Sequence, residues 1–416
     1  MKRSWFFLSL LIFPALIQAG ENLALRYTEI ETLLRQKNGA VQSSQTSIES
    51  ANARTGFLAR SFLPQVTLSA GGEAFRTAGT LTGSQPFGSA DLTINLFRGG
   101  RDANEDDLRR AQAEISKAQA THAFLLELTK AQSYYWDYVY FSELIVCHDE
   151  ILKVNNKGLE SAKRRLARGL LSRTDVVGFE LHQGLITEQI ETFIHEKKLS
   201  EISLKAALGL PETIDLTVDN LRIPHDHNDP MLTAELNADR HPELLEIRQN
   251  LRIAALQKDK LASTALPVID LFGTYSLYTW RNRYYADLND RIDVAGGVRL
   301  HTPLFDGFQT SKETDAQTLQ VQALSLLASQ RKIALSASLR TTQEELRHLD
   351  ELIHRSIDRL RQTREFLTLV LDDYDRGVKD ASDVLNAIET YLNYLKEDAS
   401  RRQNYQIVRS RLSAFL

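Results

Sequence analysis

The most extended feature in the pattern of apolar and polar positions is a run from Thr310 to Arg376 that contains neither glycine nor proline. Its apolar residues recur at near-heptad spacing with charged residues between them, as in a helix that buries one narrow stripe against other helices. Gly377 ends the run. A run of the same character extends from Arg101 to Lys157. The pattern therefore predicts two very long helices of coiled-coil type.

Between the helical runs, the period of the pattern changes to two. Apolar and polar residues alternate through Val66–Ala74 and again through Ser89–Leu96, and a loop rich in glycine, threonine and serine separates the two stretches. The same alternation returns in Ile269–Leu277 and Ile292–Leu300. A period of two predicts β-strands with one apolar face and one polar face. Two hairpins are thus inserted into a helical chain.

The order of elements occurs twice along the chain, which indicates internal duplication. We divide the chain into a first repeat at residues 20–210, an irregular connecting segment at 211–240 that Pro224 and Pro230 interrupt, and a second repeat at 241–416. Three landmarks recur in one order at nearly one offset: Leu63-Pro64 with Leu266-Pro267, Arg168-Gly169 with Arg376-Gly377, and Asp175-Val176 with Asp383-Val384.

Residues 1–19 have the pattern of a secretory signal peptide. Lys2 and Arg3 precede an apolar run from Trp5 to Ile17 that is too short to span a bilayer, and Ala19 ends a suitable cleavage site. The whole chain has a net charge of −4, which becomes −6 without Lys2 and Arg3. This charge does not indicate nucleic acid as a partner. The single cysteine, Cys147, permits no internal disulfide.

The sequence contains no recognisable catalytic or cofactor-binding motif. It has no glycine-rich phosphate loop, no His-Glu-x-x-His, no Cys-x-x-Cys and no nucleophile elbow. We therefore predict a protein that is not an enzyme and that binds no cofactor or metal. Two polar clusters are interpreted as solvated surface, the first as a turn between prolines and the second as one face of a helix: His225, Asp226, His227 and Asp229; and Arg401, Arg402, Arg409 and Arg411.

The two outer strands of the predicted four-stranded sheet would each have an edge without a hydrogen-bond partner. Each of the four strands is about ten residues long, which is enough to cross a bilayer when tilted, but a four-stranded sheet leaves two open edges that hydrocarbon does not tolerate. Two copies would give an eight-stranded barrel whose interior side chains would fill, and three copies would give twelve strands and room for a water-filled lumen. Several aromatic residues fit the girdle of such a barrel: Tyr275, Tyr278, Trp280, Tyr284 and Tyr285. The pattern leaves open an alternative, a water-exposed β-layer on a soluble periplasmic coiled-coil adaptor or scaffold.

Taken together, these landmarks resemble the TolC-type outer-membrane efflux and secretion channels. The resemblance covers essentially the whole chain after residue 19 and rests on the duplication, the Leu-Pro pairs, the Arg-Gly pairs and the motif Thr302–Gly307. The first repeat departs from the pattern, with Asn95 where Pro303 stands in the second. The resemblance implies a mainly α protein with a membrane β-barrel. Its homotrimer would join twelve strands into a barrel and continue as a coiled-coil tunnel.

The resemblance also implies a location and partners. The barrel would lie in the outer-membrane lipid of a Gram-negative bacterium, with the helical tunnel in the periplasm. A periplasmic membrane-fusion adaptor protein and an inner-membrane transporter of the ABC or RND type would dock at the far end. The channel would export small toxic compounds or a type I secreted protein.

Finally, the resemblance implies a gate at the tips of the helix hairpins, where Gly169, after Arg168, and Gly377 would form the turns. Asp383 matches the first of two constriction aspartates, and Asn386 occupies the place of the second. Tyr374 and Lys379 match residues that tie neighbouring tips closed, and Asp175 matches a partner in the first repeat. We expect Tyr374 and Lys379 to hold the channel closed and Asp383 to set its ion selectivity.

Overall fold

The computed structural model describes residues 22–76, 82–219, 222–226, 228–235, 237–279 and 290–413. The chain forms two compact units. One, which we call the tip unit, comprises Met1–Gln42, Leu125–Glu235 and Thr341–Ala414; the other, the sheet unit, comprises Ser43–Phe124, Leu236–Arg340 and the last two residues. The predicted signal peptide lies outside the described residues.

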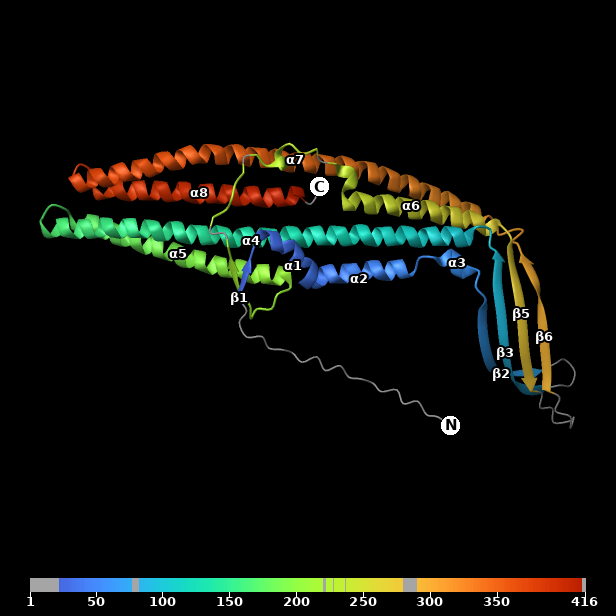
Figure 1. Ribbon diagram of the computed structural model, residues 1–416. Helices are drawn as coiled ribbons and strands as arrows, with labels where there is room; N and C mark the ends of the chain where they lie inside the picture. The colour runs from blue at the N-terminus through green and yellow to red at the C-terminus, as the bar shows by residue number, and fades with distance from the viewer. Residues whose placement is uncertain are drawn as a thin grey trace, which may run out of the picture. The chain divides into compact units, whose positions relative to one another are not determined.

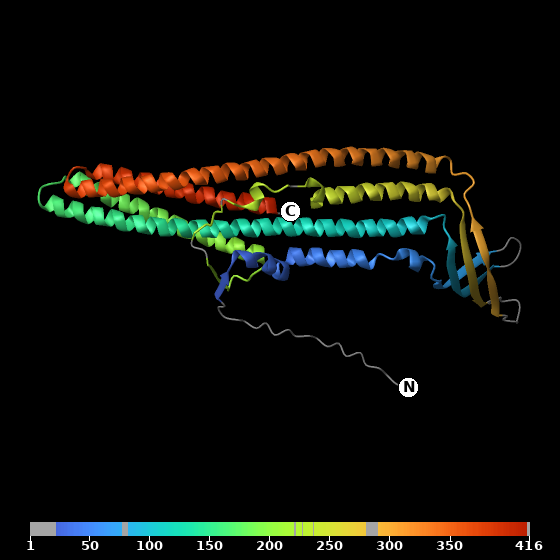
Figure 2. The same ribbon diagram turned by 45° about the horizontal axis from the view of Figure 1, so that its top comes forward.

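The sheet unit contains one antiparallel sheet in the order β2-β3-β5-β6 (Figures 1 and 2). The strands are β2 (Gln65–Arg76), β3 (Thr82–Phe97), β5 (Val268–Thr279) and β6 (Asp290–His301). The two hairpins predicted from the alternation are therefore present, and β3 pairs with β5 to join them. In the described part of the chain, β2 and β6 each have one edge without a strand partner.

The register of the sheet separates its two faces as the alternation predicts. On one face Val66 pairs with Leu92, and Leu271 pairs with Val298. On the other face Thr67 pairs with Asp91, which in turn pairs with Thr274. The apolar face is left open to the surroundings. Large apolar residues on it are strongly exposed in the protomer: Val66, Leu68, Val294, Val298 and Leu300.

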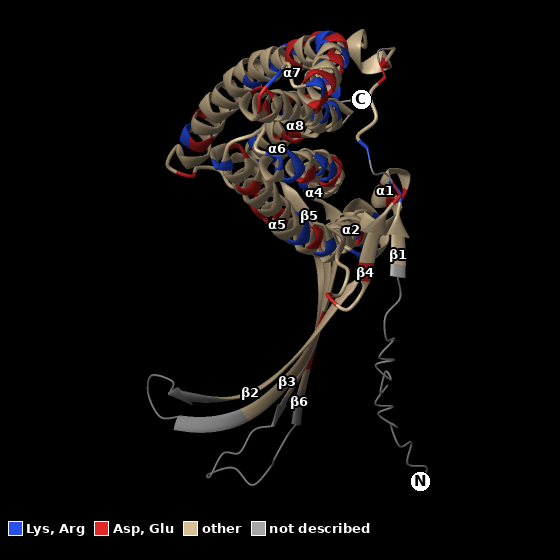
Figure 3. Cartoon of the chain, turned by 90° about the vertical axis from the view of Figure 1, so that its left-hand side faces the viewer, with Lys and Arg blue, Asp and Glu red and all other residues tan. Residues whose placement is uncertain are grey.

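Charge is distributed unevenly between helices and strands. Lysine, arginine, aspartate and glutamate are spread over the helices and are sparse on the sheet (Figure 3). Of the predicted aromatic girdle, Tyr275 lies on β5 with its side chain 44% exposed. The structure does not describe the side chains of the other four members.

Where the strands of the sheet unit pass into helices, a close approach of the chain and a half-buried arginine hold the segments together. Gly99, after β3, has a φ of 60°, and a Cβ added there would lie 2.6 Å from Cβ of Leu266. Arg101 donates to the carbonyls of Ser263 and Thr264 at 3.2 and 2.8 Å. Asn95, which replaces the proline of the second repeat, donates to Asp102. The two hairpins are therefore tied together where they leave the sheet.

The helices of the sheet unit lead into and out of these strands. They are most of α2 (Gly39–Ala53), α3 (Phe57–Ser61), α6 (Pro242–Ala262) and the first parts of α4 (Arg101–Ala167) and α7 (Gln309–Arg376). Short 3-10 turns occur at Ala238–Arg240 and Ser263–Ala265. The two very long helices predicted from the sequence are α4 and α7. No helix of the described chain is long and apolar enough to cross a membrane.

The tip unit is a packed set of helices with one small sheet. It contains α1 (Ile30–Lys37), α5 (Arg173–Leu208), α8 (Ala381–Ser413) and the remaining parts of α4 and α7. Its apolar core joins α4, α5, α7 and α8 through residues such as Ile151, Phe179, Leu367 and Ile388. The connecting segment adds β4 (Asp215–Val218) and a 3-10 turn at Pro230–Leu232.

The sequence pattern predicts one long helix from Asn22 to Arg60 with a weak point at Asn38-Gly39, and this prediction is wrong at its start. Residues Asn22–Leu25 form strand β1, which pairs in parallel with β4, and a 3-10 turn at Tyr27–Glu29 follows. The backbone partners come from a segment almost two hundred residues away, so the local pattern could not show them. Asn38 is a break, as the pattern suggested, because its side chain donates to the carbonyl of Ala207 at 2.7 Å and caps α2.

The two faces of the sheet provide a direct test of what surrounds it. Leu68→Arg should destabilise the folded protein by about 2–4 kcal/mol if this residue faces hydrocarbon near the bilayer midplane, since arginine is costly there. Thr67→Arg, one position along and on the opposite face, is the matched control and should be tolerated. Denaturant unfolding in lipid vesicles measures both. Equal tolerance at the two positions would mean that water covers both faces.

Candidate functional site at the helix tips

The tip unit ends in two helix hairpins, whose turns lie at the same end of the unit (Figure 1). Gly169 has a φ of 74° and Gly377 a φ of 81°. Leu170 N–H donates to the carbonyl of Arg165 at 3.0 Å, and Val378 N–H donates to that of Asp373 at 2.9 Å. Each glycine thus ends its helix in a left-handed conformation, with a bond that reaches back five residues. The two repeats build the same turn.

The helices that follow the turns start with the same reciprocal cap. Ahead of α5, Asp175 N–H donates to Ser172 Oγ at 3.3 Å, and Ser172 N–H donates to Asp175 Oδ2 at 3.2 Å. Ahead of α8, Asp383 and Asp380 exchange the equivalent bonds at 3.0 and 3.4 Å. These are capping boxes, in which a carboxylate also faces the positive end of the helix dipole. Backbone hydrogen bonding from Asp383 lowers the pKa of Asp380 below its usual value.

The residues that resemblance assigns to the constriction lie around the second turn. Lys379 Nζ is 3.3 Å from Asp383 Oδ2, and the two side chains are 42% and 38% exposed. Asn386 is exposed one turn further along α8, and Arg168 is exposed beside the first turn. These four side chains are therefore accessible to other molecules at the tips.

Tyr374 has a different position. Its side chain is 1% exposed, and its ring packs against Phe179 with centroids 6.0 Å apart. The Arg165 guanidinium lies over the ring at 4.6 Å. The Tyr374 hydroxyl is buried without a hydrogen-bond partner among the described residues. Burial raises the pKa of Tyr374 above its usual value.

Arg165 itself was not singled out from the sequence. Its only local signal is that it belongs to a basic run at the end of a helix, a common place for cations because of the helix dipole. In the structure Arg165 Nη2 donates to the carbonyl of Asp375 at 2.8 Å. Ser161 Oγ donates to Oδ1 of the same aspartate at 3.5 Å. The end of α4 therefore holds the end of α7.

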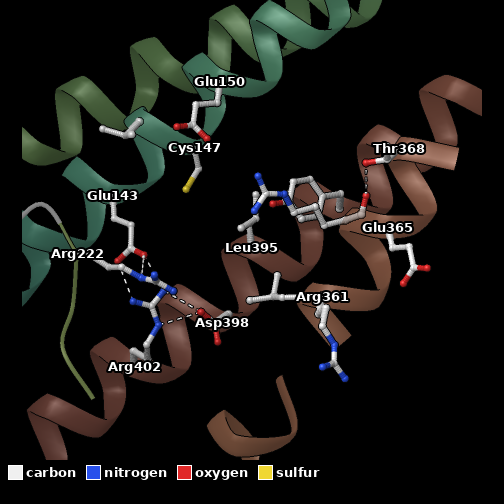
Figure 4. Close-up of a pocket in the computed structure, with 14 residues that line it drawn as sticks. Glu143, Cys147, Glu150, Arg222, Arg361, Glu365, Thr368, Leu395, Asp398 and Arg402 are labelled. Atoms are coloured by element: carbon white, nitrogen blue, oxygen red, sulfur yellow. Dashed lines mark hydrogen bonds and ion pairs between the residues drawn. The ribbon is translucent and has the colours of Figure 1, made fainter. Parts of the chain in front are cut away.

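The interpretation of the arginine cluster on α8 as a solvated face is wrong for Arg402. Its side chain is buried and contacts Glu143 Oε1 at 2.6 Å and Asp398 Oδ2 at 2.8 Å (Figure 4). It also donates to the carbonyl of Ile223 at 2.9 Å. Glu143 Oε2 also accepts from Ile223 N–H at 3.1 Å. The guanidinium thus joins α4, α8 and the connecting segment. A single sequence cannot show this burial, because Asp398 is a neighbour on the same helix but Glu143 and Ile223 come from distant parts of the chain.

Two members of the cluster in the connecting segment, His225 and Asp229, are more buried than in a solvated turn, whereas Asp226 is exposed as predicted. Asp229 is 6% exposed and accepts from Tyr405 Oη at 3.2 Å and from Arg409. His225 Nε2 is 3.0 Å from Asp350 Oδ1. His227 lies outside the described residues. Within the described residues no group of three or more His, Cys, Asp or Glu side chains could hold a metal ion. The cluster binds the segment to the helices.

A groove of about 720 Å³ lies beside Arg402 in the tip unit (Figure 4). Residues of α4, α7 and α8 line it together with Arg222 of the connecting segment, and acidic, basic and apolar side chains are all among them. Cys147 faces this groove, where burial raises the pKa of the thiol to about 11. The thiol therefore stays protonated and weakly reactive at neutral pH.

The fold and the paired hairpins define a class of protein, the outer-membrane export channels built from long helices and a small sheet. The sequence matches the model of the family described as "Outer membrane efflux protein" over residues 32–210 and 234–416. The chain belongs to this family. It is an outer-membrane efflux protein with its helical part in the periplasm.

Solved structures show the same fold. The outer membrane protein VceC from Vibrio cholerae aligns with a TM-score of 0.78 at 14% identity, covering 94% of this chain and 95% of that one. The CmeC outer membrane channel of Campylobacter jejuni gives 0.75 at 14% identity, covering 94% and 85%. The open state of the MtrE outer membrane channel of Neisseria gonorrhoeae gives 0.73 at 15%, covering 94% and 88%. A search of the curated proteins finds no match to this sequence.

The buried network around Arg402 predicts a large loss of stability on substitution. Arg402→Ala should lower the free energy of unfolding by about 3–5 kcal/mol, because it leaves Asp398 buried without its cation and leaves Glu143 only the exposed Arg222 at 3.7 Å. Arg411→Ala, an exposed position on the same helix, is the matched control and should change stability by less than about 0.5 kcal/mol. Denaturant unfolding followed by helical circular dichroism measures both. A loss as small as the control's would show that the network is solvated.

Proposed function

We propose that the protein is a homotrimeric channel through which cargo leaves the periplasm for the exterior. The observation that carries the proposal is the sheet of the protomer, which has an apolar exposed face and two open edges. Strand edges within hydrocarbon leave backbone groups unsatisfied at a cost of several kcal/mol each. Joining three sheets edge to edge satisfies all of them and encloses a lumen lined by the polar face.

The helices of the tip unit support the same assembly. One face of α5 carries large apolar side chains that are exposed in the protomer, of which Leu181 is 66% exposed. Neighbouring copies packed side by side would cover this face, as the coiled-coil pattern requires. The exposed apolar residues of α5 are Val177, Leu181, Leu185, Ile194, Leu199 and Ile202.

The gate of this channel is proposed at the hairpin tips. Three copies of Asp383 around the axis would form a ring of negative charge that attracts cations. Asn386 is neutral at the place of a second ring, so cation binding should be weaker than in a channel with two rings. Lys379, exposed and already beside Asp383, can exchange its partner within the chain for one on a neighbouring tip. We assign it to the latch between copies.

The partners follow from the family and not from a contact within the protomer. We propose a periplasmic membrane-fusion adaptor and an inner-membrane transporter of the ABC or RND type, which supplies the energy. The cargo is either small toxic compounds or a type I secreted protein. A soluble periplasmic scaffold, the alternative from the sequence pattern, finds no support in the family to which the chain belongs.

Assembly and insertion should be inseparable. Cross-linking of detergent-extracted full-length protein should trap a three-chain species, because a protomer alone retains two unpaired strand edges in the bilayer. Gel mobility with and without the cross-linker measures the number of chains. A stable folded monomer recovered from the membrane would contradict the proposal.

Conductance tests the gate. In single-channel recordings, Lys379→Ser should raise mean conductance by loosening the latch, and Asp383→Ala should reduce the preference for cations. Asp372→Ala, an exposed position on α7 before the turn, is the control for a general change of charge. Wild-type conductance and selectivity in both test variants would place the constriction elsewhere along the channel.

A further inference from the structure

We propose that Arg165 is a positioning residue of the gate, which holds the tips of the two hairpins of one protomer together. The inference rests on the proposed channel function. It concerns the contact within a protomer, whereas Lys379 and Asp383 are assigned to contacts between copies. The residues that carry it are Arg165, Tyr374 and Asp375, all within the tip unit.

Arg165 connects both turns at once. Its carbonyl accepts the backbone bonds of the first turn, from Arg168 N–H at 3.1 Å and from Leu170 N–H at 3.0 Å. Its guanidinium donates to the carbonyl of Asp375 at 2.8 Å, two residues before the glycine of the second turn. A displacement of one tip relative to the other must break the side-chain bond while the backbone bonds stay with the first turn.

The carbonyl that Arg165 reaches is favourable for a cation. It belongs to the last turn of α7, where carbonyl groups lack partners within the helix and the helix dipole is negative. The same guanidinium covers the ring of Tyr374 at 4.6 Å, in a cation–π arrangement. An arginine is suited to both contacts, because its planar fork can donate along one edge while its face lies on a ring.

The Tyr374 hydroxyl does not serve as the latch in this arrangement. It is buried and has no hydrogen-bond partner among the residues that the structure describes. A hydroxyl covered in this way within one protomer cannot reach a neighbouring tip unless Tyr374 first leaves its site. The ring, in contrast, packs between Arg165 and Phe179. Tyr374 therefore acts by packing, and Arg165 keeps it in place.

The duplication does not reproduce this contact. The position of the second repeat equivalent to Arg165 is Asp373, whose carbonyl accepts the corresponding bond of the second turn from Val378. Its side chain pairs with Arg376 of the same helix at 4.0 Å. The contact between the hairpins is therefore made by the Arg165 side chain of the first hairpin, and a single substitution of Arg165 removes it.

The test is single-channel recording on the full-length protein in planar bilayers. Arg165→Gln should raise the ratio of open to closed time about tenfold, the effect of losing one charged hydrogen bond together with a cation–π contact. Arg165→Lys should have a smaller effect, since it keeps the charge but not the fork. Arg164→Gln, an adjacent exposed arginine with the same loss of charge, is the matched control and should behave as wild type.

Two variants of Tyr374 separate positioning from a general structural role. Tyr374→Phe should gate as wild type, because only the unpartnered hydroxyl is lost. Tyr374→Leu should open more often, and adding Arg165→Gln to it should have little further effect, since both changes remove one contact. Cross-linking confirms that each variant remains a trimer, and Arg165→Lys provides a readout if Arg165→Gln does not assemble.

Three outcomes would overturn the inference. They are wild-type gating in Arg165→Gln, an equal effect in Arg164→Gln, or a tenfold effect in Tyr374→Phe. Each leaves the channel itself intact if Lys379→Ser still changes conductance. If neither the wild type nor Lys379→Ser conducts, the proposed function fails, and this inference fails with it.

Discussion

The backbone hydrogen bonds at the edges of the sheet are the constraint on which the rest of the structure depends. Strands β2 and β6 have unpaired edges in the protomer, and an outer-membrane protein cannot leave such groups in hydrocarbon. The edges can be satisfied only by further strands. This sheet has four strands within the described residues, so the proposed trimer would supply the missing neighbours from other copies. The physical reason for the proposed assembly therefore lies first in the sheet, and the exposed apolar face of α5 adds to it.

The long helices must stay aligned although each of them buries only a narrow apolar stripe. Buried polar contacts near the connecting segment add to the packing of this stripe. Arg402 joins Glu143 and the carbonyl of Ile223, and Asp229 joins Tyr405. A buried ion pair adds little net stability over an apolar core, but a displaced partner leaves a charge buried alone. Such contacts favour one register of the helices over its alternatives.

The tips combine rigid and exchangeable contacts. The turns and capping boxes satisfy the helix ends within each hairpin, so the hairpins are well-defined bodies. An apolar core joins the two hairpins of the protomer, and near the turns Tyr374 is buried beneath Arg165. Lys379 and Asp383 are half exposed and paired only across one helical turn. If the tips form the proposed gate, a closed state maintained in this way would open when a few side chains change partners, while the helices stay folded.

The sequence by itself determined the features that depend on neighbours along the chain. The alternation in Val66–Ala74 and the near-heptad run before Gly377 each specify an element and its apolar face, because side-chain direction repeats with the backbone period. The resemblance of these elements to TolC-type channels then indicated the family. Tertiary structure decided what depends on residues far apart in the chain. It made Asn22–Leu25 a strand by pairing it with β4, and it buried Arg402 and Asp229 against distant helices. It also placed Arg165 over Tyr374, a contact between two hairpins that no local pattern encodes.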